Sequence, residues 1–457
     1  MPTTTRLPAI LAEGRALLAL AWPMVIAQLA KIGTGVVDTI MAGHYSATDL
    51  AAIAIGYNIW LPLYLLILGV ILGSTYMIAQ HVGAGRIQRV RDSLPQALWL
   101  ALALGLVISP LCYFAEPLLQ LLDLAGETQD RSLGYLQAVA FGMTGAALFE
   151  ALRCHSQGIG ILRPFAVASV LGFLANIPLN YALMYGSWGF PEMGARGCGW
   201  ATAISMWLSP ALIGFYMLRA EQLKPYLPEL RLVAPQLAAI AAIVRVGLPL
   251  GLTFFVEVAF FSVIAMFIAT MGDTAIASHQ IAFNVWDVVY MPLIACGSAM
   301  ATRVGQAIGA GNRSAMRLSI GCGISMTVMV GLLGMLALLA APDLIARAYT
   351  NDLEITAMAV LLIRLAALFI AIDSAQVATT FCLRAFKDTD YPFLAMCIAY
   401  WLITLPLGYW LGIVSADNPL DGTVAFWQSM IAGITVASLL VFGRLYWRLR
   451  RPLSVAD

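Results

Sequence analysis

The sequence contains few charged residues. Only 11% of its 457 residues are Asp, Glu, Lys or Arg and 61% are hydrophobic, against roughly 25% and 45–50% in soluble domains. This composition excludes a soluble globular fold. Because the 25 basic residues nearly equal the 24 acidic ones, the net charge of +1 gives no general attraction to nucleic acid. We therefore expect membrane lipid around the protein and no nucleic-acid partner.

Motifs for metal binding, disulfide bonding and ATP hydrolysis are also missing. The seven cysteines are scattered without a CxxC pair, and the four histidines show no ligand spacing, so we predict neither a disulfide framework nor a metal site. No GxxxxGK[ST] loop occurs, so energy must come from an ion gradient rather than from ATP. A membrane-embedded transferase or hydrolase would need a clustered nucleophile and base. None is visible, so we predict that the protein is not an enzyme and has no cofactor.

Long apolar runs fill most of the chain. A helix needs roughly 20 apolar residues to cross a bilayer, and β-barrel strands of about ten alternating residues do not fit uninterrupted runs such as 332–341. We predict an all-α integral membrane protein with twelve transmembrane helices, near residues 17–42, 51–79, 94–115, 132–152, 164–185, 198–218, 240–270, 276–302, 318–341, 355–382, 391–413 and 424–447.

The basic residues indicate the orientation of these helices, because Lys and Arg accumulate in cytoplasmic loops. With the N-terminus inside, most of the 25 basic residues fall at the termini or in alternate connections, including Arg384 and Lys387 after the tenth span. We therefore expect both termini to be cytoplasmic. The first span is too long for a signal peptide and lacks a clear cleavage site, so we expect it to remain as a membrane helix.

The two halves of the chain are related by an internal repeat. When the sequence is shifted by 226 residues without a gap, residues 23–93 match residues 249–319 at fourteen positions. The matches include Asn, Trp, Tyr and the Gln-x-x-Gly-Ala-Gly segments at 80–85 and 306–311, which an apolar bias alone would not align. Both copies start inside and hold six spans, so they are parallel repeats like those of some secondary transporters.

This repeat predicts two pseudo-symmetric six-helix lobes, 1–218 and 240–457, joined by a cytoplasmic linker at 219–239. Two such lobes normally enclose a path, and rocking one against the other opens the path to each side of the membrane in turn. The arrangement favours a transporter. The repeat alone would only record a duplication, because a fold does not determine a function.

Acidic side chains inside the predicted spans mark candidate sites, because an ionised group at bilayer depth costs at least about 2.5–3.5 kcal/mol. Glu150 has Arg153 three residues later and suggests an interfacial ion pair. We assign Asp287 to substrate binding. The other acids in the spans are Asp38, Glu257 and Asp373.

Glu257 shares a helix face with two aromatic residues. Helical spacing places Phe254 and Phe261 at i−3 and i+4 from it. A carboxylate flanked by aromatic rings suits an organic cation, and a desolvated carboxyl also suits a proton. The alternative is packing phenylalanines beside an acid that pairs with a neighbouring helix. Asp373 has no basic residue at i±3 or i±4, so it needs a partner from another helix or a bound cation.

Asp38 has a different set of neighbours. Lys31 lies seven residues earlier on the same face, about 10.5 Å away along the helix, so a Lys31–Asp38 pair in which neither residue is functional is one interpretation. Asn176 and Asn180 are one turn apart on the fifth span. They could hydrogen-bond a carboxyl, or they could join two helices.

Several motifs carry a family resemblance. They are Val37-Asp38-Thr39-Ile40-Met41-Ala42-Gly43-His44, the two Gln-x-x-Gly-Ala-Gly segments, Asn176-Ile177-Pro178-Leu179-Asn180-Tyr181, Gly194-Ala195-x-Gly197-Cys198-Gly199-x-Ala201-Thr202 and Tyr400-Trp401-x-x-x-x-Pro406-Leu407-Gly408-Tyr409. Together they span nearly the whole chain. The sequence resembles the multidrug and toxic compound extrusion (MATE) family, and in particular its NorM branch of bacterial exporters.

The resemblance implies a bacterial inner-membrane antiporter that exports cationic or amphipathic organic compounds in exchange for Na⁺ or H⁺. It implies coupling-ion roles for Glu257, Asp373, Tyr290 and Asp38, with Na⁺ at Glu257 and Asp373 as one candidate, and a polar N-lobe pocket of Asn176, Asn180 and Thr202. We expect Phe254, Phe261 and Asp287 to contact substrate, and the protein to be a monomer. The alternative is a flippase of lipid-linked precursors, which would favour basic residues in its cavity, whereas the charges here are mostly acidic.

Overall fold

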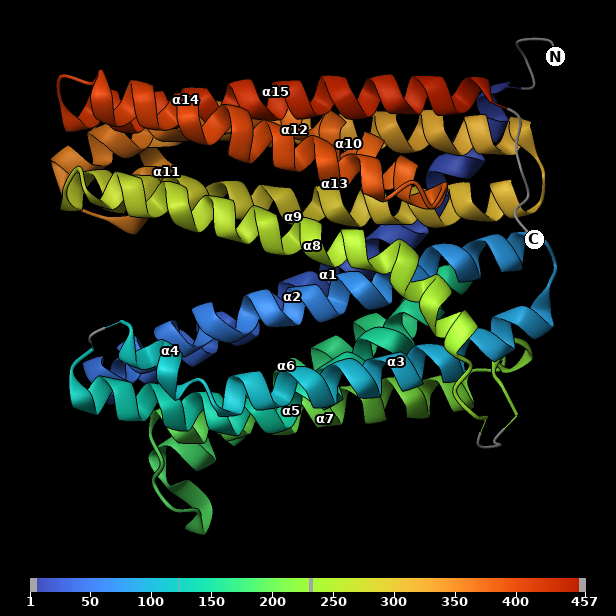
Figure 1. The fold of residues 1–457 in the computed structure, drawn as a ribbon, viewed down its shortest axis with the longest axis horizontal. Helices are drawn as coiled ribbons and strands as arrows, with labels where there is room; N and C mark the ends of the chain where they lie inside the picture. The colour runs from blue at the N-terminus through green and yellow to red at the C-terminus, as the bar shows by residue number, and fades with distance from the viewer. Residues whose placement is uncertain (1–5, 123, 230–232, 452–457) are drawn as a thin grey trace. The chain divides into compact units, whose positions relative to one another are not determined.

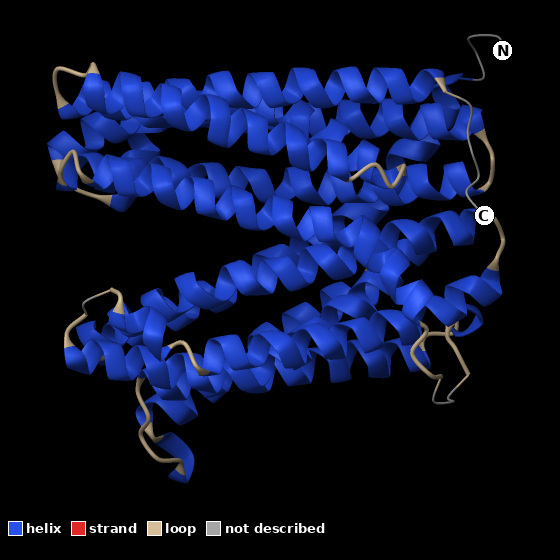
Figure 2. Cartoon of the chain, in the orientation of Figure 1, coloured by secondary structure: helices blue, strands red, loops and turns tan. Residues whose placement is uncertain are grey.

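The computed structural model describes residues 6–122, 124–229 and 233–451. Within these ranges the chain is helical apart from short connections, and no strand occurs (Figure 1; Figure 2). In the described part of the chain, twelve helical segments are long and apolar enough to cross a membrane. The predicted all-α fold with twelve transmembrane helices is therefore confirmed.

The twelve spans follow the chain in two sets of six. The first six are α1 (Arg6–Tyr45), α2 (Ala47–Gly83), α3 (Ile87–Tyr113), α5 (Gly126–Ile159), α6 (Arg163–Tyr185) and α7 (Ala195–Arg219). The next four are α8 (Leu237–Ala269), α9 (Asp273–Gly309), α10 (Arg313–Ala340) and α12 (Leu353–Ala385). The eleventh combines α13 (Asp390–Cys397) and α14 (Leu405–Tyr409) with π-helical turns at Ile398–Thr404 and Trp410–Val414, and the twelfth is α15 (Pro419–Arg450).

Among the described residues, two short α-helices lie in the connections, α4 (Glu116–Gln120) and α11 (Pro342–Tyr349). The sequence patterns do not predict them. Several long helices also extend beyond their predicted spans, as α5 does on both sides of 132–152. Hydropathy marks only the apolar part of a helix, whereas the helix itself continues as long as its backbone hydrogen bonds do.

The two Gln-x-x-Gly-Ala-Gly segments end α2 and α9 with the same turn. After α2, the N–H of Gly85 (φ +68°) donates to the carbonyl of Val82, and the next N–H donates to the carbonyl of His81. After α9, Gly311 (φ +65°) forms the corresponding pair of bonds. This is the Schellman cap, in which a residue in the left-handed conformation is usually glycine. The sequence repeat therefore corresponds to a repeated helix-ending turn.

The helices form two compact units. The N-terminal unit is Trp22–Phe254, and the C-terminal unit is Met1–Ala21 together with Phe255–Asp457. In the N-terminal unit α5 packs against α2, α3 and α7, and in the C-terminal unit α12 packs against α9, α10 and α15. The fourth span of each half is therefore central in its unit. The predicted lobe limits, 1–218 and 240–457, stay a prediction; the compact units differ in that α1 and α8 each contribute to both.

Glycines explain why the first part of α8 belongs to the N-terminal unit. A Cβ atom on Gly247 would lie 1.8 Å from the carbonyl oxygen of Val70, and one on Gly69 would lie 2.3 Å from the Cα atom of Gly251. Only glycine leaves room for such an approach. The backbones of α2 and α8 are thus in direct contact.

An ion pair holds the first part of α1 in the C-terminal unit. Arg303 on α9 donates to both carboxylate oxygens of Glu13, at 3.0 and 2.6 Å. Ser319 on α10 donates to the same carboxylate at 2.7 Å. Because Glu13 is buried, with 7% of its surface exposed, these bonds anchor α1 firmly to α9 and α10.

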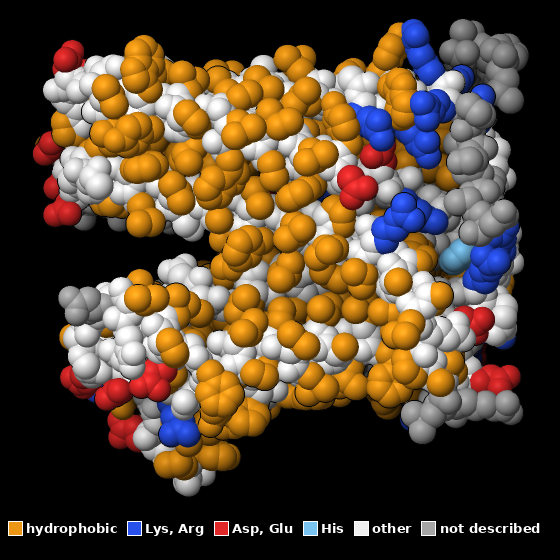
Figure 3. Space-filling view, viewed as in Figure 1, with side chains coloured by type: hydrophobic (Ala, Val, Ile, Leu, Met, Phe, Trp, Pro, Cys, Tyr) orange, Lys and Arg blue, Asp and Glu red, His pale blue; other side chains and the backbone are white. Residues whose placement is uncertain are grey.

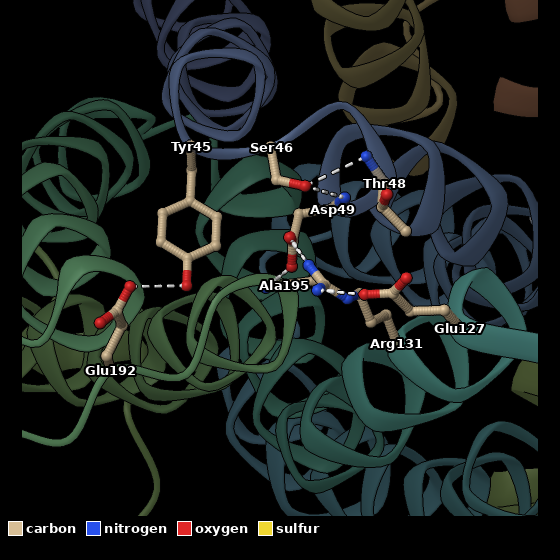
Figure 4. A network of polar contacts seen from close by, with 8 residues as sticks. All are labelled: Tyr45, Ser46, Thr48, Asp49, Glu127, Arg131, Glu192 and Ala195. Atoms are coloured by element: carbon tan, nitrogen blue, oxygen red, sulfur yellow. Dashed lines mark hydrogen bonds and ion pairs between the residues drawn. The ribbon is translucent and has the colours of Figure 1, made fainter.

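A second polar network ties helix ends together in the N-terminal unit (Figure 4). Asp49, in the first turn of α2, accepts a hydrogen bond from the backbone N–H of Ala195 at 2.7 Å and pairs with the guanidinium of Arg131. Arg131 also donates to Glu127 at 2.6 Å. The carboxylate of Asp49 thus caps the N-terminus of α7 and joins α2, α5 and α7.

The charges of the C-terminal unit differ between its two ends. The helices α9, α12 and α15 carry the acids Asp273, Glu354 and Asp421 in their first turns, whereas α12 and α15 carry arginines in their last turns. On the face drawn in Figure 3, basic side chains of this unit gather at the end where α15 finishes, and hydrophobic side chains cover the length between. This pattern supports the predicted orientation, which stays a prediction.

Candidate functional site

Asp38 is the buried acid of the N-terminal unit. It lies on α1 with 8% of its surface exposed, and its Oδ1 accepts a hydrogen bond from Asn180 at 2.5 Å. Asn180 also donates to Asn176 Oδ1 at 2.9 Å, and Asn176 donates to Ser205 Oγ at 3.5 Å. The chain of hydrogen bonds therefore joins α1, α6 and α7, and the structure brings together Asp38 and both predicted asparagines.

Thr202 lies on α7, one turn before Ser205, with 7% of its surface exposed. Among the described residues, its Oγ1 has no hydrogen-bond partner, and neither has Oδ1 of Asn180. Buried polar atoms are almost always satisfied by protein or by ordered water. These two oxygens therefore keep hydrogen-bonding capacity for water or for a bound group.

The glycine-rich start of α7 explains how Thr202 is placed. A Cβ atom on Gly197 would lie 2.3 Å from the carbonyl oxygen of Leu183 on α6, and one on Gly199 would lie 2.7 Å from that of Tyr135 on α5. The absence of side chains at these two positions lets α7 contact both backbones. The motif that carries the family resemblance is thus a packing motif that positions the next turn.

Lys31 and Glu150 lie in a cluster between α1, α2 and α5. The Nζ atom of Lys31 lies 4.4 Å from the centroid of the Tyr64 ring. The Tyr64 hydroxyl donates to Glu150 Oε1 at 2.6 Å, and Arg153 donates to Glu150 Oε2 at 2.5 Å. The predicted Glu150–Arg153 pair is confirmed. The pair is buried within the protein, with 3% and 7% of the two residues exposed, and its predicted place at the membrane interface stays a prediction.

In the C-terminal unit, Glu257 on α8 and Asp373 on α12 lie close enough for their carboxyl groups to interact electrostatically. Tyr290 on α9 interacts with both. Asp373 is 3% exposed and Glu257 is half-buried. Among the described residues Asp373 Oδ2 has no hydrogen-bond partner. The side chain of Trp286 nevertheless lies close to the carboxyl group of Asp373. The structure therefore brings together the three residues predicted for this half.

Aromatic rings form a continuous cluster in the same unit. The centroid of Phe261 lies 5.3 Å from that of Trp286, which stacks on Tyr290 at 4.8 Å. Phe260 stacks on Tyr400 at 4.4 Å, and Phe261 lies 6.0 Å from Tyr400. Tyr400 also interacts electrostatically with both carboxyl groups of the site. Ring faces and carboxylates are thus combined in one place.

Asp287 and Phe254 are also predicted to contact substrate. Asp287 is half-buried on α9 and interacts electrostatically with Tyr290. Phe254 is the last residue of the N-terminal unit, whereas Glu257 and Phe261 belong to the C-terminal unit. Its predicted contact with substrate stays a prediction.

The sequence analysis did not predict that Arg384 is buried. We expected Arg384 in a cytoplasmic connection, but α12 continues to Ala385, and Arg384 is buried with 5% of its surface exposed. Its guanidinium lies 4.4 Å from the Phe381 ring centroid and interacts electrostatically with Glu257. The distribution of basic residues shows on which side of a membrane a charge lies, and it carries no information about burial.

Tyr400 and Trp286 were also missing from the predicted site. Tyr400 belongs to one of the motifs that carry the family resemblance, and Trp286 is one of the repeated residues. Both signals were therefore present in the sequence, but neither indicated a contact with the acids. Among the described residues, no group of three or more His, Cys, Asp or Glu is arranged to hold a metal ion.

Comparisons with known proteins identify relatives that match nearly the whole chain. The sequence matches the MatE family over residues 23–182 and 249–410, one segment in each half. It is 39% identical over 443 residues to multidrug resistance protein PmpM of Pseudomonas aeruginosa, covering 97% of this chain and 93% of the relative. It is 36% identical over 443 residues to multidrug resistance protein MdtK of Edwardsiella ictaluri, covering 97% of each.

Solved structures show the same fold at lower sequence identity. The eukaryotic MATE transporter AtDTX14 aligns with a TM-score of 0.85 at 16% identity, over 97% of this chain and all of that one (100%). An outward-facing multidrug resistance MATE family transporter aligns with a TM-score of 0.86 at 19% identity, over 96% of each chain.

Proposed function

Because this chain belongs to the MATE family of transporters, we propose that it exports cationic or amphipathic organic compounds across the bacterial inner membrane in exchange for Na⁺ or H⁺. The observation that carries the proposal is the pair of carboxyl groups, Glu257 and Asp373, beside the ring cluster of the C-terminal unit. Acids at bilayer depth usually mark an ion or substrate pathway.

The chemistry of this pair fits both the driving ion and the cargo. A carboxylate supplies charge, and the faces of Trp286, Tyr290 and Tyr400 supply the negative end of the ring quadrupole, so an organic cation would gain from both. A proton would bind to a carboxyl oxygen directly. A Na⁺ ion would be coordinated by the two carboxylates together with hydroxyl or carbonyl oxygens, since hard cations prefer oxygen ligands.

Asp38 supports a second site, in the N-terminal unit. Asn180 binds one oxygen of this carboxyl, and the amide is itself held by Asn176. The geometry of the carboxyl is thus maintained whether or not the acid carries a proton. We propose that Asp38 is a protonation site that acts alongside the C-terminal pair, and that the buried hydroxyl of Thr202 on α7 is a further polar group of this half.

Exchange requires that the ion and the cargo compete. If one site held both, they would cross together and dissipate the gradient. By linkage, drug binding must then lower the affinity for the ion by the same factor as the ion lowers the affinity for the drug. Competition at Glu257 and Asp373 would meet this requirement, because one set of carboxyl groups serves both cations.

The proposal is tested by Glu257→Gln and Asp373→Asn in proteoliposomes. Each variant removes a charge with little change of shape, so each should insert and fold. Gradient-driven ethidium efflux should fall at least tenfold, which corresponds to about 1.4 kcal/mol or more. The matched control is Asp417→Asn, which alters an exposed acid between α14 and α15. Normal pumping by both site variants at normal expression would show that this site is wrong.

Equilibrium binding of ethidium identifies the coupling ion. For H⁺ coupling, affinity should rise with pH through the titration range of the site, and adding ethidium to weakly buffered protein should release protons. For Na⁺ coupling, Na⁺ should weaken binding at fixed pH where K⁺ does not. Affinity that is indifferent to both ions would exclude direct competition at Glu257 and Asp373, and coupling would have to run through Asp38.

A further inference from the structure

Arginines are concentrated at the end of α15 in the C-terminal unit. Arg444, Arg448 and Arg450 lie in the last two turns of the helix, and Arg451 follows directly after it. Arg450 and Arg451 are exposed, and the other two are half-buried. Figure 3 shows that basic side chains gather at this end of the unit. The end of α15 is therefore a concentrated and accessible positive charge.

This charge is only partly compensated. Among the described residues, Asp388 is the one acid that pairs with these arginines, and it accepts a hydrogen bond from Arg444 at 2.8 Å. The same part of the chain offers no carboxylate within ion-pair distance of Arg448, Arg450 or Arg451. Like charges this close together repel one another, so an anion bound among them would be stabilised.

Aromatic rings hold the guanidinium groups in fixed places. The ring centroid of Trp447 lies 4.4 Å from Cζ of Arg444 and 3.5 Å from Cζ of Arg451. Arg450 lies 4.3 Å from the ring centroid of Tyr446 and donates a hydrogen bond to the Tyr446 hydroxyl. A guanidinium that stacks on a ring keeps N–H groups along its edge for other acceptors. Arg450 and Arg451 are thus positioned donors with capacity to spare.

The contacts of these arginines differ from those of a helix cap. Basic side chains near a helix C-terminus often donate to its last carbonyl groups. Here the carbonyl of Arg451 accepts instead from Arg313, in the first turn of α10, at 2.7 Å. Within the described ranges, the guanidinium groups of Arg450 and Arg451 donate to no carbonyl. Capping therefore does not explain them, and Arg313 adds another positive charge at the same place.

An exposed apolar stripe leads along α15 to the arginines. Leu439, Phe442 and Tyr446 are exposed, and their spacing of three and four residues places them on one face of the helix. Arg450 continues this face one turn later. Apolar side chains on the outer face of a membrane helix contact acyl chains, and Tyr and Trp prefer the level of the head groups. Over about three turns, the surface thus changes from apolar to aromatic to basic.

We propose that this surface binds an anionic phospholipid, with the phosphate at Arg450 and Arg451 and an acyl chain along Leu439 and Phe442. The planar fork of a guanidinium matches phosphate oxygens, and basic clusters beside membrane helices recognise anionic head groups. A free phosphate shares the chemistry of the head group, but it would leave the apolar stripe unused. The inference does not depend on the proposed function.

The competing interpretation is that these arginines only determine the orientation of α15, because basic residues accumulate on the cytoplasmic side of a membrane. Such a signal acts while the protein inserts and needs no bound lipid afterwards. Under this interpretation, the folded protein would not distinguish anionic from zwitterionic lipid at this place. The two interpretations therefore differ in the lipid preference of the purified protein.

Native mass spectrometry measures that preference. Purified full-length protein in a non-ionic detergent is titrated with phosphatidylglycerol or with phosphatidylcholine of the same acyl chains, and the affinity for the first bound lipid is determined. The site variant is Arg450→Gln with Arg451→Gln. The matched control is Arg89→Gln with Lys224→Gln, which removes two exposed positive charges of the N-terminal unit. Unchanged phosphatidylcholine binding shows that a variant is folded.

We expect the wild type to bind phosphatidylglycerol at least tenfold more tightly than phosphatidylcholine. The site variant should lose at least fivefold in phosphatidylglycerol affinity, and the control should change less than twofold. An excess of inorganic phosphate should leave the lipid bound; its complete displacement would assign the site to a free anion and overturn the lipid proposal. Equal losses in the two variants, or no lipid preference in the wild type, would also overturn the inference.

Discussion

Removing the carboxylate of Asp49 should destabilise the N-terminal unit far more than removing its neighbour Glu127, although both acids bind Arg131. The side chain of Asp49 is 2% exposed and that of Glu127 is 67% exposed. Asp49 also caps α7 through the N–H of Ala195, and α7 has no capping side chain of its own. The two ion pairs of one arginine therefore provide an internal comparison of a buried and an exposed interaction (Figure 4).

The magnitudes follow from these contacts. Losing the cap of a helix costs about 1 kcal/mol, and losing a buried hydrogen bond to a charged group costs about 1.5–3 kcal/mol. Asp49→Ala should therefore lower the free energy of unfolding by about 2.5–4 kcal/mol. Asp49→Asn keeps an acceptor for Ala195 but turns a donor toward Arg131, so its effect should be smaller. Glu127→Gln should cost less than about 0.5 kcal/mol, as exposed ion pairs do.

The assay is reversible unfolding of the purified protein in mixed micelles, titrated with a denaturing detergent and followed by tryptophan fluorescence. The expected order of stability is wild type, Glu127→Gln, Asp49→Asn and Asp49→Ala, from most to least stable. Similar losses for Glu127→Gln and Asp49→Ala would refute the reasoning, because burial would then not decide the strength of the pair. A loss below about 1 kcal/mol for Asp49→Ala would show that the cap of α7 is replaced by another group.

Three further predictions concern other parts of the chain. Glu13→Gln, which removes the charge that anchors α1 in the C-terminal unit, should lower stability by about 1.5–3 kcal/mol in the same assay; unchanged stability would contradict the anchor. Lys387 (φ +59°) stands where comparable helix ends have glycine, and burial lowers its pKa, so Lys387→Gly should stabilise the protein by about 0.5–1 kcal/mol at neutral pH. Because the pKa of Lys387 is lower in the folded than in the unfolded state, the wild-type protein becomes more stable as pH rises toward 10.5, the ordinary Lys value. The stability advantage of Lys387→Gly over wild type should therefore shrink as pH rises, and an advantage that grew with pH would contradict the prediction. With both termini cytoplasmic, an impermeant maleimide should label a single cysteine in intact cells at Asp417, but only in opened cells at Gln88 or Ala310; labelling of the last two from outside would refute the orientation.

The number and type of the membrane helices could be predicted from sequence because hydropathy and the repeat both reflect burial in lipid. The local backbone geometry and the packing of these helices could not be predicted from the sequence. The π-helical turns at Ile398–Thr404 change the backbone hydrogen bonds and leave the hydropathy of the span unaltered. The exchange of α1 and α8 segments between the compact units depends on close approaches at single glycines such as Gly247, and the sequence pattern does not show what those glycines face.

The candidate site could be predicted where one helix determined the geometry. Asn176 and Asn180 are one turn apart, so their common direction follows from helical spacing, and the structure adds only that both belong to the same chain of hydrogen bonds as Asp38. Arg384 could not be predicted in the same way. Its burial depends on how far α12 extends and on the helices around it, which are tertiary facts.

The internal repeat predicts which aromatic residues the two halves share, but it does not predict the charges beside them. It correctly relates the Trp–Tyr pairs of the two halves, because these rings are part of the shared scaffold. The charge beside them is not shared: Lys31 lies at Tyr64, and Glu257 interacts with Tyr290. The central helices also differ, since α5 offers Glu150 paired with Arg153 and α12 offers Asp373. Duplication can preserve the positions of aromatic residues while the charged residues beside them diverge. In this chain the internal repeat therefore relates the positions of Lys31 and Glu257 but does not predict the sign of their charge.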